Sequence, residues 1–208
     1  MTHRKLGVLT VLALLLAVAV QSPAQANLFA NAGFEDPVTY DGPPFVGSWE
    51  GFNAGAGSGA GNAAVMPRSG LQHLRLVIEG VDNSFAGVFQ DVPVVAGQLM
   101  VFSGWHMTPS ATLGLGVEMR IEWRNAGSNT EVGRTPNLTV PPVGVYSQFS
   151  LSGTVPAGAD LARVVYAVQT FGPEPTNNGE VFVDDVFFGS DATPSKATTW
   201  GRIKSLYK

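Results

Sequence analysis

The 208-residue chain has no cysteine, so no disulfide can hold its fold together. It is also poor in charge, since only 13% of its residues are Asp, Glu, Lys or Arg, and its formal net charge is −4. A mildly acidic chain lacks the basic patches that attract nucleic acids or anionic membranes. Its hydrophobic fraction of 45% is too high for a disordered chain. We therefore expect no nucleic-acid partner and a fold that rests on a hydrophobic core.

Signatures of common catalytic centres are also missing. The only histidines are His3, His73 and His106, and neither a zinc-ligand spacing nor a nucleophile elbow occurs. Glu118 and Glu122 lie four residues apart on a predicted strand, or about 13 Å by strand rise. That separation is too large for the carboxylate pair of a glycosidase. We expect no enzymatic activity.

The first 26 residues have the pattern of a secretory signal. Arg4 and Lys5 precede an apolar stretch at 6–20, and a small-x-small cleavage pattern ends at Ala26. We expect cleavage before Asn27, no transmembrane span after cleavage, and a secreted or cell-surface protein. An uncleaved anchor is the alternative, although the apolar stretch is short for a membrane span.

The rest of the chain predicts strands separated by turns, with no convincing amphipathic helix. Residues 55–61 are predicted to form a flexible loop, because they are rich in glycine. This pattern is typical of an all-β fold, and we predict a single-domain antiparallel β-sandwich of the jelly-roll type over 27–189. The predicted strands are 47–52, 71–79, 85–92, 99–107, 115–124, 131–135, 146–153, 161–171 and 181–188.

Two adjacent acids, Asp184 and Asp185, interrupt the last of these strands. Neighbouring residues on a strand point to opposite sides, so one carboxylate is directed to the side where Phe182 and Phe188 lie. A carboxylate in apolar surroundings needs a partner, either Arg or Lys or a hard cation such as Ca²⁺.

The order of seven short motifs resembles the carbohydrate-binding module families 4, 9 and 22. Each motif is weak alone, but together they extend over residues 27–189. The resemblance implies a jelly roll that binds a polysaccharide or oligosaccharide without catalysis and carries structural calcium. The motifs are 27–35 (NLFANAGFE), 48–51 (SWEG), 69–76 (SGLQHLRL), 86–92 (AGVFQDV), 97–105 (GQLMVFSGW), 149–158 (FSLSGTVPAG) and 182–186 (FVDDV).

The resemblance also implies where the calcium lies. In these families the glutamate of the opening motif and the first aspartate of the closing motif share the ion, which here are Glu35 and Asp184. Ca²⁺ takes about six to eight oxygen ligands, so Gly33 and Gln72 are candidate donors of further oxygens. The second aspartate of the pair remains the alternative ligand. The competing interpretation is that both acids cap turns or pair with Arg75.

A glycan site needs aromatic faces and a few polar groups. Trp49 and Phe52 lie in a glycine-rich stretch, although Trp49 fits the core equally well. Arg120 and Glu122 are predicted on the polar side of their strand, where a solvated face with cross-strand ion pairs is the alternative. The candidate glycan-binding residues are Trp49, Phe52, His106, Arg120, Glu122, Gln169 and Phe171.

After the predicted domain the composition changes. Residues 190–199 predict a linker, and 200–208 form a short basic tail whose apolar residues Trp200, Ile203 and Tyr207 have helical spacing. We expect the tail to bind an export or surface partner. Two functions remain open: a secreted glycan-binding module, or a structural or adhesive cell-surface protein attached or sorted through this tail.

Overall fold

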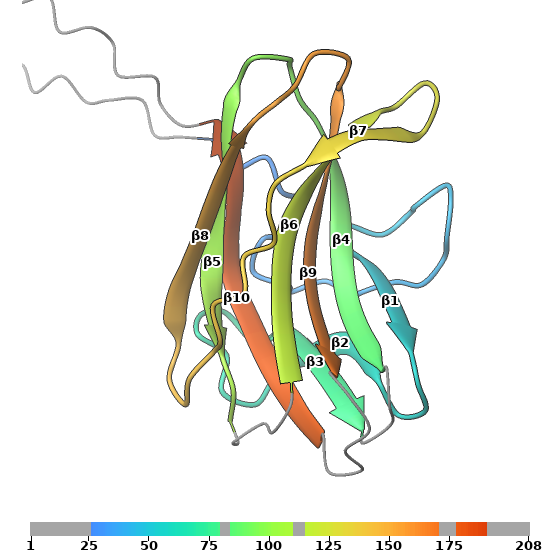
Figure 1. Cartoon of the computed structure of the whole chain (residues 1–208). Helices are drawn as coiled ribbons and strands as arrows, with labels where there is room; N and C mark the ends of the chain where they lie inside the picture. The colour runs from blue at the N-terminus through green and yellow to red at the C-terminus, as the bar shows by residue number, and fades with distance from the viewer. Residues whose placement is uncertain (1–25, 80–83, 110–114, 171–177, 191–208) are drawn as a thin grey trace, which may run out of the picture.

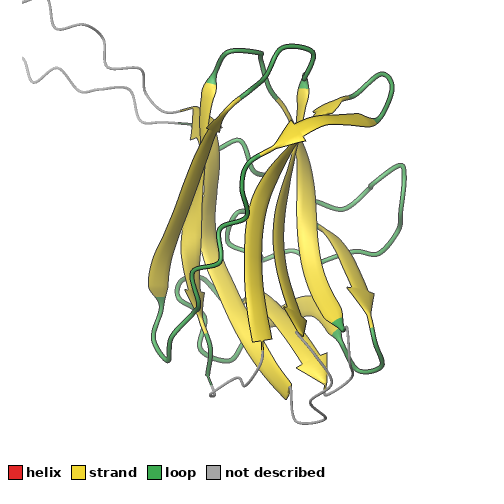
Figure 2. Ribbon diagram, viewed as in Figure 1, coloured by secondary structure: helices red, strands yellow, loops and turns green. Residues whose placement is uncertain are grey.

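Two β-sheets packed face to face make up the fold (Figures 1 and 2). The computed structural model describes residues 26–79, 84–109, 115–170 and 178–190. The tail, nearly all of the predicted signal and all of the predicted linker except Ser190 lie outside these residues. Within the described residues, no helix is long and apolar enough to cross a membrane.

Each sheet has five strands, and all neighbouring strands are antiparallel, which confirms the predicted β-sandwich. Sheet A contains, in spatial order, β1 (Glu50–Ala54), β4 (Phe85–Pro93), β9 (Leu161–Thr170), β6 (Leu115–Asn125) and β7 (Thr130–Arg134). Sheet B contains β2 (Gly59–Ala63), β3 (His73–Glu79), β10 (Asn178–Ser190), β5 (Leu99–Met107) and β8 (Ser147–Thr154).

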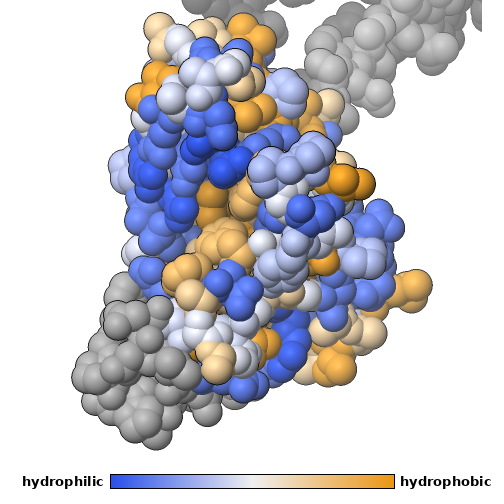
Figure 3. Space-filling model, turned by 90° about the vertical axis from the view of Figure 1, so that its right-hand side faces the viewer, coloured by the Kyte–Doolittle hydropathy of each residue, from blue (hydrophilic) through white to orange (hydrophobic). Residues whose placement is uncertain are grey.

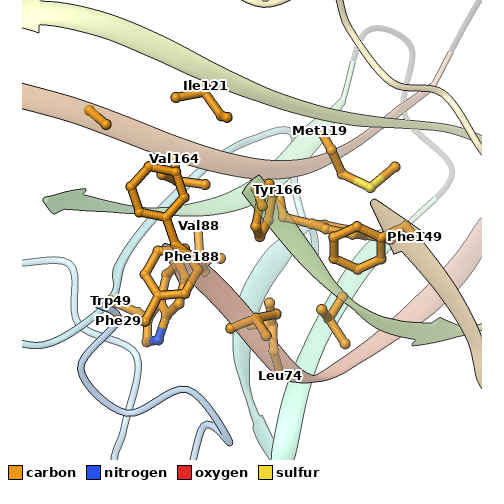
Figure 4. Packing of buried hydrophobic residues seen from close by; sticks show 14 of the residues in the cluster. Phe29, Trp49, Leu74, Val88, Met119, Ile121, Phe149, Val164, Tyr166 and Phe188 are labelled. Carbon is orange, nitrogen blue, oxygen red and sulfur yellow. The ribbon is translucent and has the colours of Figure 1, made fainter. Parts of the chain in front are cut away.

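The core lies between the sheets and follows from strand alternation. On β6, Met119, Ile121 and Trp123 are buried and face sheet B, while the residues between them face outward. Aromatic rings fill much of the interior (Figure 4), where the Phe29 ring lies 5.5 Å from that of Phe188. Without disulfides, this apolar packing is the main source of stability.

Residues 59–63 form a strand, so the prediction of a flexible loop over 55–61 is wrong at its C-terminal end. β2 pairs with β3 from Gly59 opposite Val77 to Ala63 opposite His73. Glycine and alanine have weak strand propensity. The strand is held instead by its pairing partner, which the local sequence does not show.

The closing strand β10 departs from simple alternation. Its register shifts between Asp184 and Phe187, and Asp185 has a φ of 48°. The bulge adds a residue, so Phe182 faces outward whereas Phe188 is buried in the core. The prediction that both phenylalanines share one side is therefore wrong.

Candidate functional site

Charged side chains of β6 run along the outer face of sheet A. We call Glu118, Arg120, Glu122 and Arg124 the charged row. Arg120 Nε donates to Glu122 Oε1 at 2.8 Å, Arg120 also pairs with Glu118, and Arg124 Nη1 lies 3.3 Å from Glu122 Oε2. The Glu122 side chain is only 8% exposed. The row is thus a chain of ion pairs along one strand. Arg134 Nη2 on the neighbouring strand β7 lies 4.0 Å from Glu122 Oε1, so the cross-strand pairing considered above is present as well.

A second ion pair lies on the same face, on the neighbouring strands β4 and β9. Arg163 Nε and Nη2 each donate to one carboxylate oxygen of Asp91, at 2.8 Å. These hydrogen bonds raise the pKa of Arg163 above its ordinary value, against the opposing effect of burial. Its guanidinium lies 4.0 Å from the ring centre of Phe89 and 5.5 Å from that of Phe45.

Four phenylalanines gather beside these ion pairs. The ring centres of Phe45 and Phe89 are 5.1 Å apart, those of Phe52 and Phe89 6.3 Å, and those of Phe52 and Phe85 6.1 Å. Phe45 and Phe85 keep 38% and 37% of their surface exposed. In Figure 3, hydrophilic residues form a band along one side of this face, with apolar residues next to it in a hollow.

A small cavity of about 180 Å³ opens at the Phe45 end of this face. Its lining combines two aromatic rings with acids and an amide. The lining residues are Phe45, Gly47, Ser48, Glu50, Phe89, Gln90 and Asp91. Rings beside oriented donors and acceptors are the combination that a sugar ring requires.

Four of the seven predicted glycan-binding residues lie on this face. Phe52 pairs with Gly87, and Gln169 lies between Phe85 and Gly116 in the sheet. Arg120 and Glu122 belong to the charged row. Phe171 lies outside the described residues.

Trp49 cannot offer a stacking surface, so its prediction as a glycan-binding residue is wrong. Only 1% of it is exposed, and its ring lies 4.8 Å from that of Phe29 and 4.9 Å from that of Phe34. Its indole Nε1 donates to the carbonyl of Asn31 at 3.0 Å. Trp49 therefore belongs to the core (Figure 4).

His106 was also predicted on the sugar-binding surface, and it too is buried. Its side chain points between the sheets with 0% exposure, and Nδ1 lies 2.8 Å from the Tyr166 hydroxyl. Burial lowers the pKa of His106 to about 4. Alternation from the buried residues Met100 and Phe102 already places position 106 on the inner side.

Five residues of this face were not predicted. Phe85, Phe89 and Asp91 share one side of their strand by alternation, a signal present in the sequence. Arg163 alternates in the same way with the buried Ala162 and Val164. Phe45 comes from an irregular loop, and no sequence pattern places it.

The predicted calcium region lies at the bulge of β10. Asp184 is 0% exposed, and its Oδ2 accepts N–H groups from Arg68 at 2.9 Å and Ser69 at 3.0 Å. Its Oδ1 accepts the Asp185 N–H at 2.8 Å. Burial raises the pKa of Asp184, although these N–H groups oppose the shift. Asp185 instead pairs with the Arg68 side chain, so Asp184 is the more deeply buried of the two acids.

Glu35, Gly33 and Gln72 lie in the same region. Glu35 Oε1 accepts the Leu71 N–H at 2.9 Å, and Gln72 Nε2 donates to the Glu35 carbonyl at 3.2 Å. A Cβ on Gly33 would lie 4.0 Å from both Asp184 Oδ1 and Glu35 Cγ. Of the competing interpretation, pairing with Arg75 is wrong, because Arg75 pairs with Glu180. Both acids do accept backbone N–H groups of the segment 68–71, as a capping role requires.

A calcium ion here would depend on more than carboxylates. Among the described residues, no three Asp, Glu, His or Cys side chains lie close enough together to hold a metal. The two acids would therefore need backbone and amide oxygens beside them, such as those of Gly33 and Gln72. Such a mixed oxygen set is compatible with Ca²⁺.

No protein-family model matches the sequence, and no curated protein matches it either. Solved structures do match. The enzymatically active domain of bacteriophage CBA120 tailspike protein 4 superposes with a TM-score of 0.61 and 16% identity, over 79% of this chain. The chain spans only 21% of the length of that tailspike chain.

Carbohydrate-binding modules match over nearly their whole length. A family 61 module solved with β-1,4-galactotriose has a TM-score of 0.54 and 13% identity, over 80% of this chain and 99% of that one. The CBM22-1 xylan-binding domain from Paenibacillus barcinonensis Xyn10C has a TM-score of 0.54 and 14% identity, over 82% and 97%. At these identities the likeness shows the fold, which is the β-sandwich that these modules share.

Proposed function

We propose that the chain binds a polysaccharide or oligosaccharide, without catalysis, on the outer face of sheet A. The observation that carries this proposal is the group of four phenylalanines beside the Arg163–Asp91 ion pair, on the same face as the charged row. Phenyl faces stack on sugar rings, while carboxylates accept and guanidinium groups donate hydrogen bonds to sugar hydroxyls. Because each partner of these ion pairs holds the other in place, the polar groups are oriented before a glycan arrives.

The solved neighbours and the ion pairs that hold the acids support this proposal. Two modules of similar fold are described as binding galactotriose and xylan. On this chain, Asp91, Glu118 and Glu122 are each engaged in ion pairs with arginine. Carboxylates held in this way present fixed hydrogen-bond acceptors to sugar hydroxyls.

Affinity gel electrophoresis against a panel of soluble polysaccharides tests this function. We expect at least one polysaccharide to retard the protein and Phe89→Ala to abolish most of the retardation. Phe187→Ala is the matched control, because Phe187 lies on the other sheet. The proposal fails if no polysaccharide retards the protein, or if Phe187→Ala has the same effect as Phe89→Ala.

We also propose a structural calcium ion held by Glu35 and Asp184. The buried carboxylate of Asp184 supports it, because a cation would offset the cost of keeping that charge away from water. At a concentration of about 100 times the dissociation constant, the ion would stabilise the native state by about 2.7 kcal/mol. Thermal melting with and without EDTA, together with elemental analysis, tests this. An unchanged midpoint and no bound metal would refute it.

Export to the outside of the cell is a further proposal. It rests on the signal pattern of residues 1–26, and attachment or sorting through 200–208 rests on the composition of that tail. Cell fractionation of the protein with and without 200–208 tests the tail. An identical distribution would remove its proposed role.

A further inference from the structure

The sandwich has four edge strands, and the chain itself protects three of them. On β1, the Thr39 N–H donates to the Trp49 carbonyl at 3.0 Å and the Gly51 N–H donates to the Thr39 carbonyl at 2.7 Å. On β2, the Tyr40 hydroxyl bonds both the N–H and the carbonyl of Ala60, at 2.7 and 3.0 Å. Such covers prevent unwanted strand pairing.

The third edge, β7, is protected by charge and irregularity. Glu131 and Arg134 form an ion pair on it, and its register with β6 shifts at Trp123. Each of the strands β1, β2 and β7 is also short, with five residues. Short length, charge and bulges are recognised means of blunting an edge.

The fourth edge, β8, has none of these devices. It is eight residues long and contains neither charge nor proline. Just beyond β8, the Val155 N–H donates to the Gln98 carbonyl at 2.9 Å, and the Gly97 N–H donates to the Val155 carbonyl at 2.8 Å. Both groups of Val155 therefore face the β5 side. Since peptide groups alternate along an antiparallel strand, those of Gly153 and Leu151 also face β5.

The intervening peptide groups therefore point away from β5. Among the described strands, no further one lies on that side, because β8 is the last strand of sheet B (Figure 1). Within the described residues, the N–H and carbonyl groups of these peptides have no hydrogen-bond partner. They belong to Gln148, Ser150, Ser152 and Thr154. Unpaired strand edges of this kind are templates for another strand.

We propose that β8 pairs antiparallel with β8 of a second copy, about a two-fold axis at Leu151. In this register Ser150 lies opposite Ser152 of the partner subunit, and Gln148 lies opposite Thr154 of the partner subunit. Residues that face each other then point to the same side of the sheet, as pairing requires. Every unpaired peptide group of this edge acquires a partner.

The composition of β8 favours a second copy as the occupant. A strand that meets itself brings like charges together wherever it carries one, and β8 carries none. The two-fold axis is perpendicular to the joined sheet, so both outer faces of sheet A open to the same side. If the proposed function holds, one long glycan could then engage both faces, which raises the effective affinity.

Sedimentation equilibrium of the purified protein without glycan tests the pairing. We expect a concentration-dependent dimer. Because positions 150 and 152 face each other, S150K/S152K puts lysine opposite lysine twice and should weaken the dimer about tenfold. S150K/S152E puts lysine opposite glutamate twice and should restore it. Ala157→Lys, in the exposed turn after β8, should change nothing.

The outcomes separate self-pairing from other occupants. A wild type that stays monomeric overturns the proposal, as does a dimer that S150K/S152K leaves unchanged. A monomer that dimerises only after removal of 191–208 would show that the tail covers the edge instead, which also overturns it. Far-ultraviolet circular dichroism of each variant confirms that it is folded. Loss of glycan binding would leave this result untouched.

Discussion

Two buried acids, one on the outer face of each sheet, are held in different ways. On sheet A, Glu122 is bound by Arg120 and Arg124, and water reaches the row from one side. On sheet B, no arginine side chain of the described residues pairs with Asp184, which is bound by three backbone N–H groups. An acid held by arginines can exchange partners with a ligand, whereas one held by the backbone fixes the loop that supplies the N–H groups.

The cover over sheet B explains this difference. Chain segments lie over part of its outer face and bury His73, Phe182 and Met107, which are at most 3% exposed. His73 Nε2 lies 2.8 Å from the carbonyl of Val65 in this cover, and the Tyr146 hydroxyl donates to the carbonyl of Met66 at 3.1 Å. We therefore expect structural support from sheet B and keep the proposed ligand contact on sheet A.

The largest loss of stability is expected when the buried acid of sheet B, Asp184, is removed. Asp184→Ala leaves three N–H groups without their acceptor and should lower the free energy of unfolding by about 4 kcal/mol. Asp185→Asn keeps a side chain that tolerates the positive φ and removes only the charge of a partly exposed ion pair, so it should cost less than about 1 kcal/mol. Urea unfolding of both variants measures the difference. Equal losses would contradict the distinct role of Asp184.

The second prediction concerns the interior between the two faces. Burial lowers the pKa of His106 from 6.5 to about 4, so between these values the unfolded chain binds a proton that the folded protein does not. Stability should therefore fall as the pH drops from 6.5 to 4, by ~3 kcal/mol in total from this group. Urea unfolding at several pH values measures it, and His106→Gln should flatten the dependence over this range. An equally steep dependence in that variant would show that other groups are responsible.

A smaller effect is expected from the acid of sheet A. Glu122→Gln removes the charge between Arg120 and Arg124, but Arg120 keeps Glu118 and Arg124 keeps the carbonyl of Asn129. The free energy of unfolding should fall by about 1 kcal/mol. A loss as large as that of Asp184→Ala would mean that the charged row is a structural element and not a surface open to a ligand.

Strand alternation predicts much of this comparison from the sequence. It places Arg120 and Glu122 outside, and with Phe102 as reference it also places His106 inside. Trp49 could not be assigned this way, because it precedes a short strand and its burial depends on Phe29 and Phe34 from the opening segment. Contacts between distant segments are not encoded in any local pattern.

The bulge after Asp184 and the position of Phe45 could not be predicted from the sequence either. The motif resemblance favours Asp184 over Asp185 as the calcium ligand, but the positive φ of Asp185 that redirects the strand depends on the cover around Arg68 and Ser69. Phe45 reaches Phe89 from a loop with no periodic pattern. Sequence alone thus predicts the sheets well and the loops between them poorly.

Titration calorimetry of two arginine variants with a retarding glycan tests the central claim most directly. Arg120 and Arg75 each form an ion pair on an outer face, the first on sheet A and the second on sheet B. We predict that Arg120→Ala weakens glycan binding about tenfold or more, since it removes hydrogen bonds to a charged group, while Arg75→Ala leaves binding unchanged. Unchanged binding by Arg120→Ala, or an equal loss in both variants, would contradict a glycan site on sheet A.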